Sequence, residues 1–172
     1  MSALLQQIAE EFHIPVSRLL DRHRTAYPEA AGLVVAEVGE HGREHLLTPH
    51  AAAAWQQVQR AALGDGVTIF IVSAFRSVER QTQIVRRKLA SGMPIEQVLA
   101  VSSLPGYSEH HSGRALDVGT PGCATLEYGF QDTAAFSWLQ AHAAQFDFQL
   151  SYPADNPEGY VYEPWHWCYQ RG

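Results

Sequence analysis

Two short polar segments constrain the fold of this chain more than any other feature of its sequence. The first, SEHHSGRALD, runs from Ser108 to Asp117, and the second, EPWH, runs from Glu163 to His166. Together they offer two imidazoles, a carboxylate ligand and a spare glutamate. A hydrolytic zinc site uses this set: three protein ligands, an open coordination position for water, and a base that takes the proton of that water. We therefore expect the fold to bring the two segments together.

His110, Asp117 and His166 are the expected ligands of one zinc ion. Two neutral imidazoles and one carboxylate leave the ion about one net positive charge, which lowers the pKa of bound water toward about 7. Glu163 is the expected base. Because residues i and i+3 of a strand point to opposite faces, the chain must turn or bulge near Pro164 to redirect one of these side chains.

Residues 114–118 are predicted to form a strand, with His110 at the boundary between loop and strand. Side chains alternate along a strand, so Gly113 and Ala115 would share a face with Asp117. Their small size would leave space there for an ion and a substrate.

Non-haem iron oxygenases also use two histidines and one carboxylate. Their first two ligands are commonly two residues apart on one strand, whereas His110 and Asp117 are separated by seven. A glutamate also precedes the last histidine. Both features favour hydrolysis.

The composition indicates an ordinary globular protein and no polyanionic partner. The chain has 172 residues, 46% hydrophobic and 17% charged, with a net charge of −6. This balance shows no basic patch of the kind that binds nucleic acid or an anionic membrane. We interpret the short basic run of Arg86, Arg87 and Lys88 as a solvated helix face. The N-terminal residues lack the pattern of a secretory signal, and no apolar run reaches about 20 residues. We therefore expect a cytoplasmic protein whose two cysteines form no disulfide framework.

The hydrophobic pattern predicts a single α+β domain over residues 1–172, with a central antiparallel sheet flanked by helices. Residues 1–65 are mainly helical and residues 66–172 form the catalytic core that carries the motifs. Expected helices span residues 3–12, 15–23, 49–63, 78–90, 94–101 and 132–146, and expected strands span residues 33–38, 45–47, 67–72, 114–118, 148–152 and 160–169. The run at residues 67–72 has the unbroken apolar character of a buried central strand.

These motifs resemble the VanY-type D-alanyl-D-alanine carboxypeptidases, within the zinc superfamily that includes VanX-type dipeptidases and the hedgehog signalling domain. The resemblance covers Ser73-x-Phe75-Arg76-Ser77 with Gln81, then Ser108-x-His110-x-x-Gly113-x-Ala115-x-Asp117, then Glu163-Pro164-Trp165-His166-Trp167. It implies a zinc peptidase that removes a C-terminal D-amino acid from peptidoglycan peptides.

By position, the resemblance implies that His110, Asp117 and His166 hold zinc and that Glu163 acts as general base and then acid. Arg76 would polarise the scissile carbonyl or bind the terminal carboxylate, both of which suit a guanidinium. Ser108 and Gln81 are weaker candidates for substrate contacts, with local structural roles as the alternative.

Two positions depart from the family. Phe75 stands where relatives often have tyrosine, and Cys168 stands where they often have arginine. On a strand, Cys168 would share a face with His166. It would then lie near the metal and make activity sensitive to oxidation, or be a small buried hydrophobe.

A cytoplasmic enzyme would meet recycled wall fragments, which favours L,D-carboxypeptidase action on tetrapeptides. The alternatives are D,D-carboxypeptidase action on pentapeptides that end in D-Ala-D-Ala, a D-Ala-D-Ala dipeptidase, and a zinc module that binds peptide without cutting it. Because Glu163 and all three ligands are present, the binding module is the least favoured.

Overall fold

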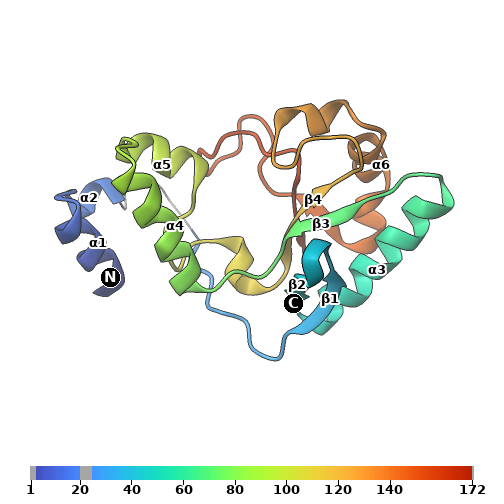
Figure 1. Cartoon of the computed structure of the whole chain (residues 1–172), viewed down its shortest axis with the longest axis horizontal. Helices are drawn as coiled ribbons and strands as arrows, with labels where there is room; N and C mark the ends of the chain where they lie inside the picture. Colours follow the sequence, from blue (N-terminus) through green and yellow to red (C-terminus); the bar gives the residue numbers. More distant parts are fainter. Residues whose placement is uncertain (1–2, 20–24, 172) are drawn as a thin grey trace.

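The computed structural model describes residues 3–19 and 25–171, which form an α+β fold (Figure 1). The helices are α1 (Ala3–Glu11), α2 (Val16–Leu19), α3 (Pro49–Gly64), α4 (Val78–Ala90), α5 (Ile95–Val101) and α6 (Ala134–His142). The strands are β1 (Val34–Val38), β2 (Glu44–Leu47), β3 (Phe70–Ser73), β4 (Ala115–Gly119), β5 (Phe148–Leu150) and β6 (His166–Tyr169). Short 3-10 turns are η1 (Glu40–Gly42), η2 (Glu109–Ser112), η3 (Tyr128–Asp132) and η4 (Ala143–Phe146).

The strands pair antiparallel, as the sequence predicted, but they form two sheets and not one central sheet. The larger has the order β3-β4-β6-β5, and β1 pairs with β2 as a separate hairpin. In the larger sheet, Asp117 of β4 lies between Ser73 of β3 and His166 of β6 in the register of paired residues. Three elements distant in sequence therefore present side chains side by side.

The expectation of a central strand at residues 67–72 was wrong, because β3 lies at one edge of the sheet. Its apolar character has another cause: the hairpin covers this edge. The Ile71 backbone N–H donates to Glu37 Oε1 of β1 at 2.9 Å, and the Phe75 N–H donates to Leu46 O of β2 at 3.0 Å. An edge whose polar groups are satisfied in this way can be buried without pairing to another strand.

A hydrophobic core joins α3, α6 and the larger sheet, at the opposite end of the molecule from α1, α2, α4 and α5 (Figure 1). Trp55 of α3 packs edge-on against Phe148 of β5, with ring centroids 6.1 Å apart. Since Trp55 and Phe148 belong to one cluster of buried residues, the division at residue 65 separates no independent cores. A second, smaller cluster joins the N-terminal helices to α5 and the loop after it, through Leu5, Ala9, Leu19, Leu99 and Leu104.

Helix boundaries follow capping chemistry, with two corrections to the sequence expectations. Ser77 caps α4, since its Oγ accepts from the Arg80 N–H at 3.0 Å. Helix α6 is shorter than the predicted span of residues 132–146, because Thr133 caps it at the start and the 3-10 turn η4 follows His142. The other correction is that Gly64 lies inside α3, with Asp65 as its C-cap. The expected end of the second helix, at residue 23, falls outside the described residues.

Within the described ranges, 3–19 and 25–171, no helix combines the length and apolarity that a bilayer crossing requires.

Gly113 was expected to lie in a strand and leave space for an ion, and this was wrong. It ends η2 in the left-handed region, with φ of 64°, before β4 begins at Ala115. A Cβ at this position would lie 2.6 Å from Leu33 Cδ2. The glycine is needed because the chain turns there in close contact with residues 30–33.

Gly113→Ala should therefore lower the free energy of unfolding by about 2–4 kcal/mol, from left-handed strain and overpacking together. Urea denaturation of the metal-free protein measures this. The matched control is Gly122→Ala, because Gly122 has φ of 81° but nothing within 4 Å of the added Cβ. Equal losses in the two variants would show that contact with Leu33 contributes nothing.

Candidate metal centre

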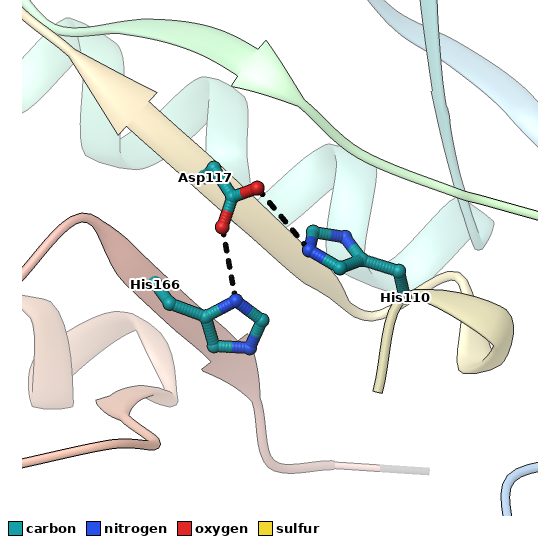
Figure 2. A group of neighbouring side chains, drawn as sticks. All are labelled: His110, Asp117 and His166. Atoms are coloured by element: carbon teal, nitrogen blue, oxygen red, sulfur yellow. Dashed lines mark hydrogen bonds and ion pairs between the residues drawn. The ribbon is translucent and has the colours of Figure 1, made fainter. Parts of the chain in front are cut away.

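The three predicted ligands converge, although they come from three different elements (Figure 2). Asp117 on β4 and His166 at the start of β6 are paired across the antiparallel sheet. Cross-strand partners carry their side chains on the same face. His110 approaches that face from η2, the turn just before β4. One potential ligand atom from each residue lies within 4.8 Å of the others.

Both imidazoles are held with one nitrogen facing the Asp117 carboxylate. His110 Nδ1–H donates to Ala74 O at 2.8 Å, which leaves Nε2 at 3.2 Å from Asp117 Oδ2. His166 Nε2–H donates to Glu109 Oε2 at 2.9 Å, which leaves Nδ1 at 2.9 Å from Asp117 Oδ1. The dashed lines of Figure 2 trace this convergence on one carboxylate.

The centre is buried and electrostatically prepared for a cation. His110, Asp117 and His166 are exposed by only 4%, 5% and 3%. Burial alone would raise the pKa of Asp117, but the facing imidazoles hold it well below its usual range. Burial alone would lower the pKa of His166, yet hydrogen bonds and charge from two carboxylates raise it to about 10. Negative surroundings that strong favour a positive charge at this point, whether a proton or a metal ion.

The donor set fits zinc. Nitrogen and carboxylate oxygen are normal zinc ligands at about 2.0–2.2 Å, and three protein ligands are the number that a catalytic zinc site uses. The distances from the Asp117 oxygens to His110 Nε2 and His166 Nδ1, 3.2 and 2.9 Å, are near those between ligand atoms that share one ion. Each histidine also has its second nitrogen committed to an oxygen acceptor, as metal-binding histidines almost always do.

Glu163 lies beside the three residues because the chain turns there. The predicted strand over residues 160–169 is shorter, beginning only at His166. The His166 N–H donates to Glu163 O at 3.1 Å, which closes a turn through Pro164. Glu163 Oε2 thus comes within 4.0 Å of His166 Nδ1. The redirection that the sequence required is therefore a tight turn.

Burial and nearby charges bring the pKa of the Glu163 carboxyl into the range that proton transfer uses. Burial, reinforced by the nearby Asp117 charge, raises its pKa to about 7, while His166 and Arg76 act in the opposite direction. A carboxylate with a pKa close to neutrality can both take and return a proton under mild conditions.

Arg76 lies on the other side of Asp117, with its guanidinium fixed by neighbours. Nη1 donates to Gln81 Oε1 at 3.0 Å, Nη2 donates to Ser73 Oγ at 3.2 Å, and Nη2 is 3.9 Å from Asp117 Oδ2. Gln81 itself is 1% exposed and donates to Ser103 O at 2.6 Å. Gln81 therefore lies behind Arg76 and orients it, whereas Ser108 lines the adjoining cavity.

A cavity of about 450 Å³ opens over these groups. Its wall includes Arg76, Glu163 and the three converging residues, with Tyr152 and Trp165 as aromatic surfaces. Lys88 also lines it, with Nζ 2.7 Å from Ser102 Oγ. The sequence interpretation of Lys88 as part of a solvated face was wrong. The cavity thus carries two cations, which suits a ligand with a carboxylate.

Two further residues support the centre: sequence reasoning missed Glu109 and left the role of His111 open. Glu109 supplies the carboxylate that accepts from His166 Nε2–H. His111 is fully buried: its Nδ1–H donates to Arg76 O at 2.6 Å, and its Nε2 accepts from the Gly106 N–H at 3.1 Å. His111 therefore holds the backbone that carries Arg76. The position of both residues beside His110 in the motif was the available signal.

Cys168 does not line the cavity and is 3% exposed. Burial, together with the charge of Glu109, raises the pKa of its thiol. Because oxidation proceeds through the thiolate, these surroundings favour the small buried hydrophobe over the oxidation-sensitive thiol.

Comparison with known proteins places this site in a family. The model of the VanY D-alanyl-D-alanine carboxypeptidases matches residues 44–172. The chain belongs to this family. It is 30% identical over 148 residues to the putative carboxypeptidase YodJ of Bacillus subtilis (strain 168), covering 82% of this chain and 54% of YodJ. The chain thus spans about half the length of that relative.

Two solved structures are similar in fold. The LdcB LD-carboxypeptidase superposes with a TM-score of 0.75 at 30% identity, over 84% of this chain and 72% of LdcB. A mutant of the vancomycin-resistance D,D-pentapeptidase VanY in complex with Zn(II) has a TM-score of 0.63 at 28% identity, over 83% and 82% of the two chains. The VanY-like fold expected from the sequence is confirmed.

The geometry predicts that the purified protein binds one divalent cation such as zinc, and that His166→Ala loses it because a ligand is gone. Metal analysis by mass spectrometry after dialysis gives the stoichiometry. His50→Ala is the matched control, since His50 is exposed and is not one of the three converging residues. Full metal content in folded His166→Ala would contradict the assignment.

Proposed function

We propose that this protein is a zinc carboxypeptidase that removes a C-terminal D-amino acid, D-alanine, from peptidoglycan peptides. His110, Asp117 and His166 would hold the zinc ion, Glu163 would be the general base, and Arg76 would bind substrate. The preferred substrate would be a tetrapeptide, cleaved by L,D-carboxypeptidase action. Family membership and the similarity to a Zn(II)-bound VanY support this assignment.

One observation supports the proposal most strongly. Two imidazole nitrogens face the two oxygens of one buried carboxylate, while a glutamate with a pKa near 7 lies beside them on the wall of an open cavity. A zinc ion bound there would supply an acidified water and a Lewis acid for the scissile carbonyl. These are the parts that amide hydrolysis needs.

Glu163, Arg76 and Lys88 have separate roles in proton transfer and substrate binding. Glu163 accepts the proton of the attacking water and returns it to the leaving amine, and its pKa of about 7 suits both transfers. Arg76, fixed by Gln81 and Ser73, presents a rigid guanidinium 3.9 Å from Asp117 Oδ2. This proximity to the metal ligands favours polarisation of the scissile carbonyl over binding of the terminal carboxylate. Lys88 then provides a second positive charge for that carboxylate.

Similarity to the LdcB LD-carboxypeptidase, with a TM-score of 0.75 at 30% identity, supports action on tetrapeptides. The cavity of about 450 Å³ is of a size that holds drug-sized ligands, more than a free dipeptide of two alanines needs. The presence of Glu163 argues against a module that binds without cutting. That the reaction takes place in the cytoplasm, on recycled wall fragments, stays a prediction from the sequence.

The substrate test uses a tetrapeptide with a terminal D-Ala and a pentapeptide with a terminal D-Ala-D-Ala, each incubated with zinc-loaded protein. We expect the tetrapeptide to lose one D-Ala at least tenfold faster, with the products identified by mass. Free D-Ala-D-Ala should be cleaved poorly. Cleavage of the pentapeptide alone would replace the L,D assignment by the D,D alternative, and cleavage of none would remove the proposed activity.

Glu163→Ala should keep zinc and lose hydrolysis, because the glutamate moves protons and does not hold the ion. We expect kcat to fall by about 10²–10⁴, while metal analysis still finds one zinc per chain. Glu40→Ala, an exposed carboxylate outside the cavity, serves as the control. If Glu163→Ala turns over peptide at the normal rate, Glu163 is not the base.

A further inference from the structure

The segment of residues 27–33 lies before the family-matched region, which begins at residue 44. It forms no helix or strand, yet every third residue, at 27, 30 and 33, is half-buried while those between are exposed. Two backbone hydrogen bonds attach it to the first motif: the Tyr27 N–H donates to Gly106 O, and the Ala30 N–H donates to His111 O, both at 2.8 Å. This segment therefore runs along the turn that carries His110.

The side chains of the same segment reach further into the site. The Tyr27 hydroxyl donates to Glu109 Oε1 at 3.3 Å. The Glu29 carboxylate accepts from the Val78 N–H at the start of α4, the helix that follows Arg76. Leu33 packs on the face of Gly113 where a Cβ would clash. The segment thus contacts both sides of the motif region.

Glu109 is the point where these contacts meet the metal centre. Its side chain is 12% exposed. Oε2 accepts from His166 Nε2–H at 2.9 Å and from Ser151 Oγ–H at 2.6 Å, and Oε1 accepts from the Tyr27 hydroxyl. Three donors from three separate parts of the chain therefore fix both oxygens of this carboxylate.

This arrangement has a defined effect on a metal-binding histidine. His166 Nε2 faces Glu109, so the proton stays on Nε2 and the lone pair of Nδ1 points toward Asp117 and His110. A carboxylate partner of this kind orients the imidazole and makes it a stronger ligand, and its loss typically costs 10–100-fold in metal affinity.

We propose that Glu109 is a positioning residue for His166, and that residues 27–33 complete the support of the metal centre by holding Glu109 through Tyr27. The metal-bearing fold would then extend beyond the family-matched region into the preceding segment. The inference rests on the metal centre of the proposed function but not on its substrate.

The test measures zinc affinity of the full chain by competition with a chromophoric chelator. Glu109→Gln keeps the size of the side chain but removes its charge, and should weaken zinc binding 10–100-fold. Tyr27→Phe removes one hydrogen bond and should weaken it roughly twofold to tenfold. Tyr27→Phe should add nothing further in the Glu109→Gln background, because Tyr27 acts through Glu109. Tyr107→Phe, a half-buried tyrosine on the adjoining loop, is the control and should bind zinc normally.

Thermal unfolding of the metal-free variants shows whether each is folded. If Glu109→Gln does not fold, Ser151→Ala, which removes the second donor to Oε2, takes its place with the same expectation as Tyr27→Phe. Wild-type affinity in folded Glu109→Gln would overturn the role of Glu109. An equal effect of Tyr27→Phe in both backgrounds would overturn the link to residues 27–33. Failure of the wild-type protein to bind zinc would instead remove the proposed function itself.

Discussion

The pairing of Asp117 with His166 across β4 and β6 is the interaction on which the site depends. Antiparallel register places both side chains on one face, and the carboxylate then faces His110 with its other oxygen. A buried carboxylate between two imidazoles is costly to desolvate unless positive charge is present. The fold has therefore placed strong negative potential and well-oriented nitrogen donors at a point that suits a cation.

Successive layers of contacts keep this arrangement rigid. Ala74 O fixes the tautomer of His110, Glu109 fixes that of His166, and Gln81 fixes the guanidinium of Arg76. The two histidines of the motif have different tasks, because His110 faces Asp117 while His111 holds the backbone of Arg76. Groups that face the cavity are thus held by a frame of hydrogen bonds, which is the condition for electrostatic preorganisation.

The candidate metal-binding residues His110, Asp117 and His166, the antiparallel pairing and most elements could be predicted from sequence, because residue types with metal chemistry and apolar periodicity are local signals. The edge position of β3 could not, since the Ile71 N–H at that edge is satisfied by Glu37, a side chain of a hairpin distant in sequence. The sequence showed that the chain must turn or bulge near Pro164 to bring Glu163 beside His166. It did not show which of the two occurs, because Pro164 permits both backbone geometries. Gly113 and Lys88 were misinterpreted because their neighbours, Leu33 and Ser102, are set by tertiary packing. Glu109 was missed because a carboxylate bonded to a buried imidazole has the same sequence signature as a solvated one.

X-ray absorption at the zinc edge tests the central claim most directly, because it identifies the atoms bound to the ion. The account predicts an ion bound at about 2.0–2.2 Å by nitrogen and oxygen only, with the scattering pattern of two imidazoles and a carboxylate. A sulfur neighbour at about 2.3 Å, from Cys168 or Cys123, would contradict it. So would a spectrum without imidazole scattering.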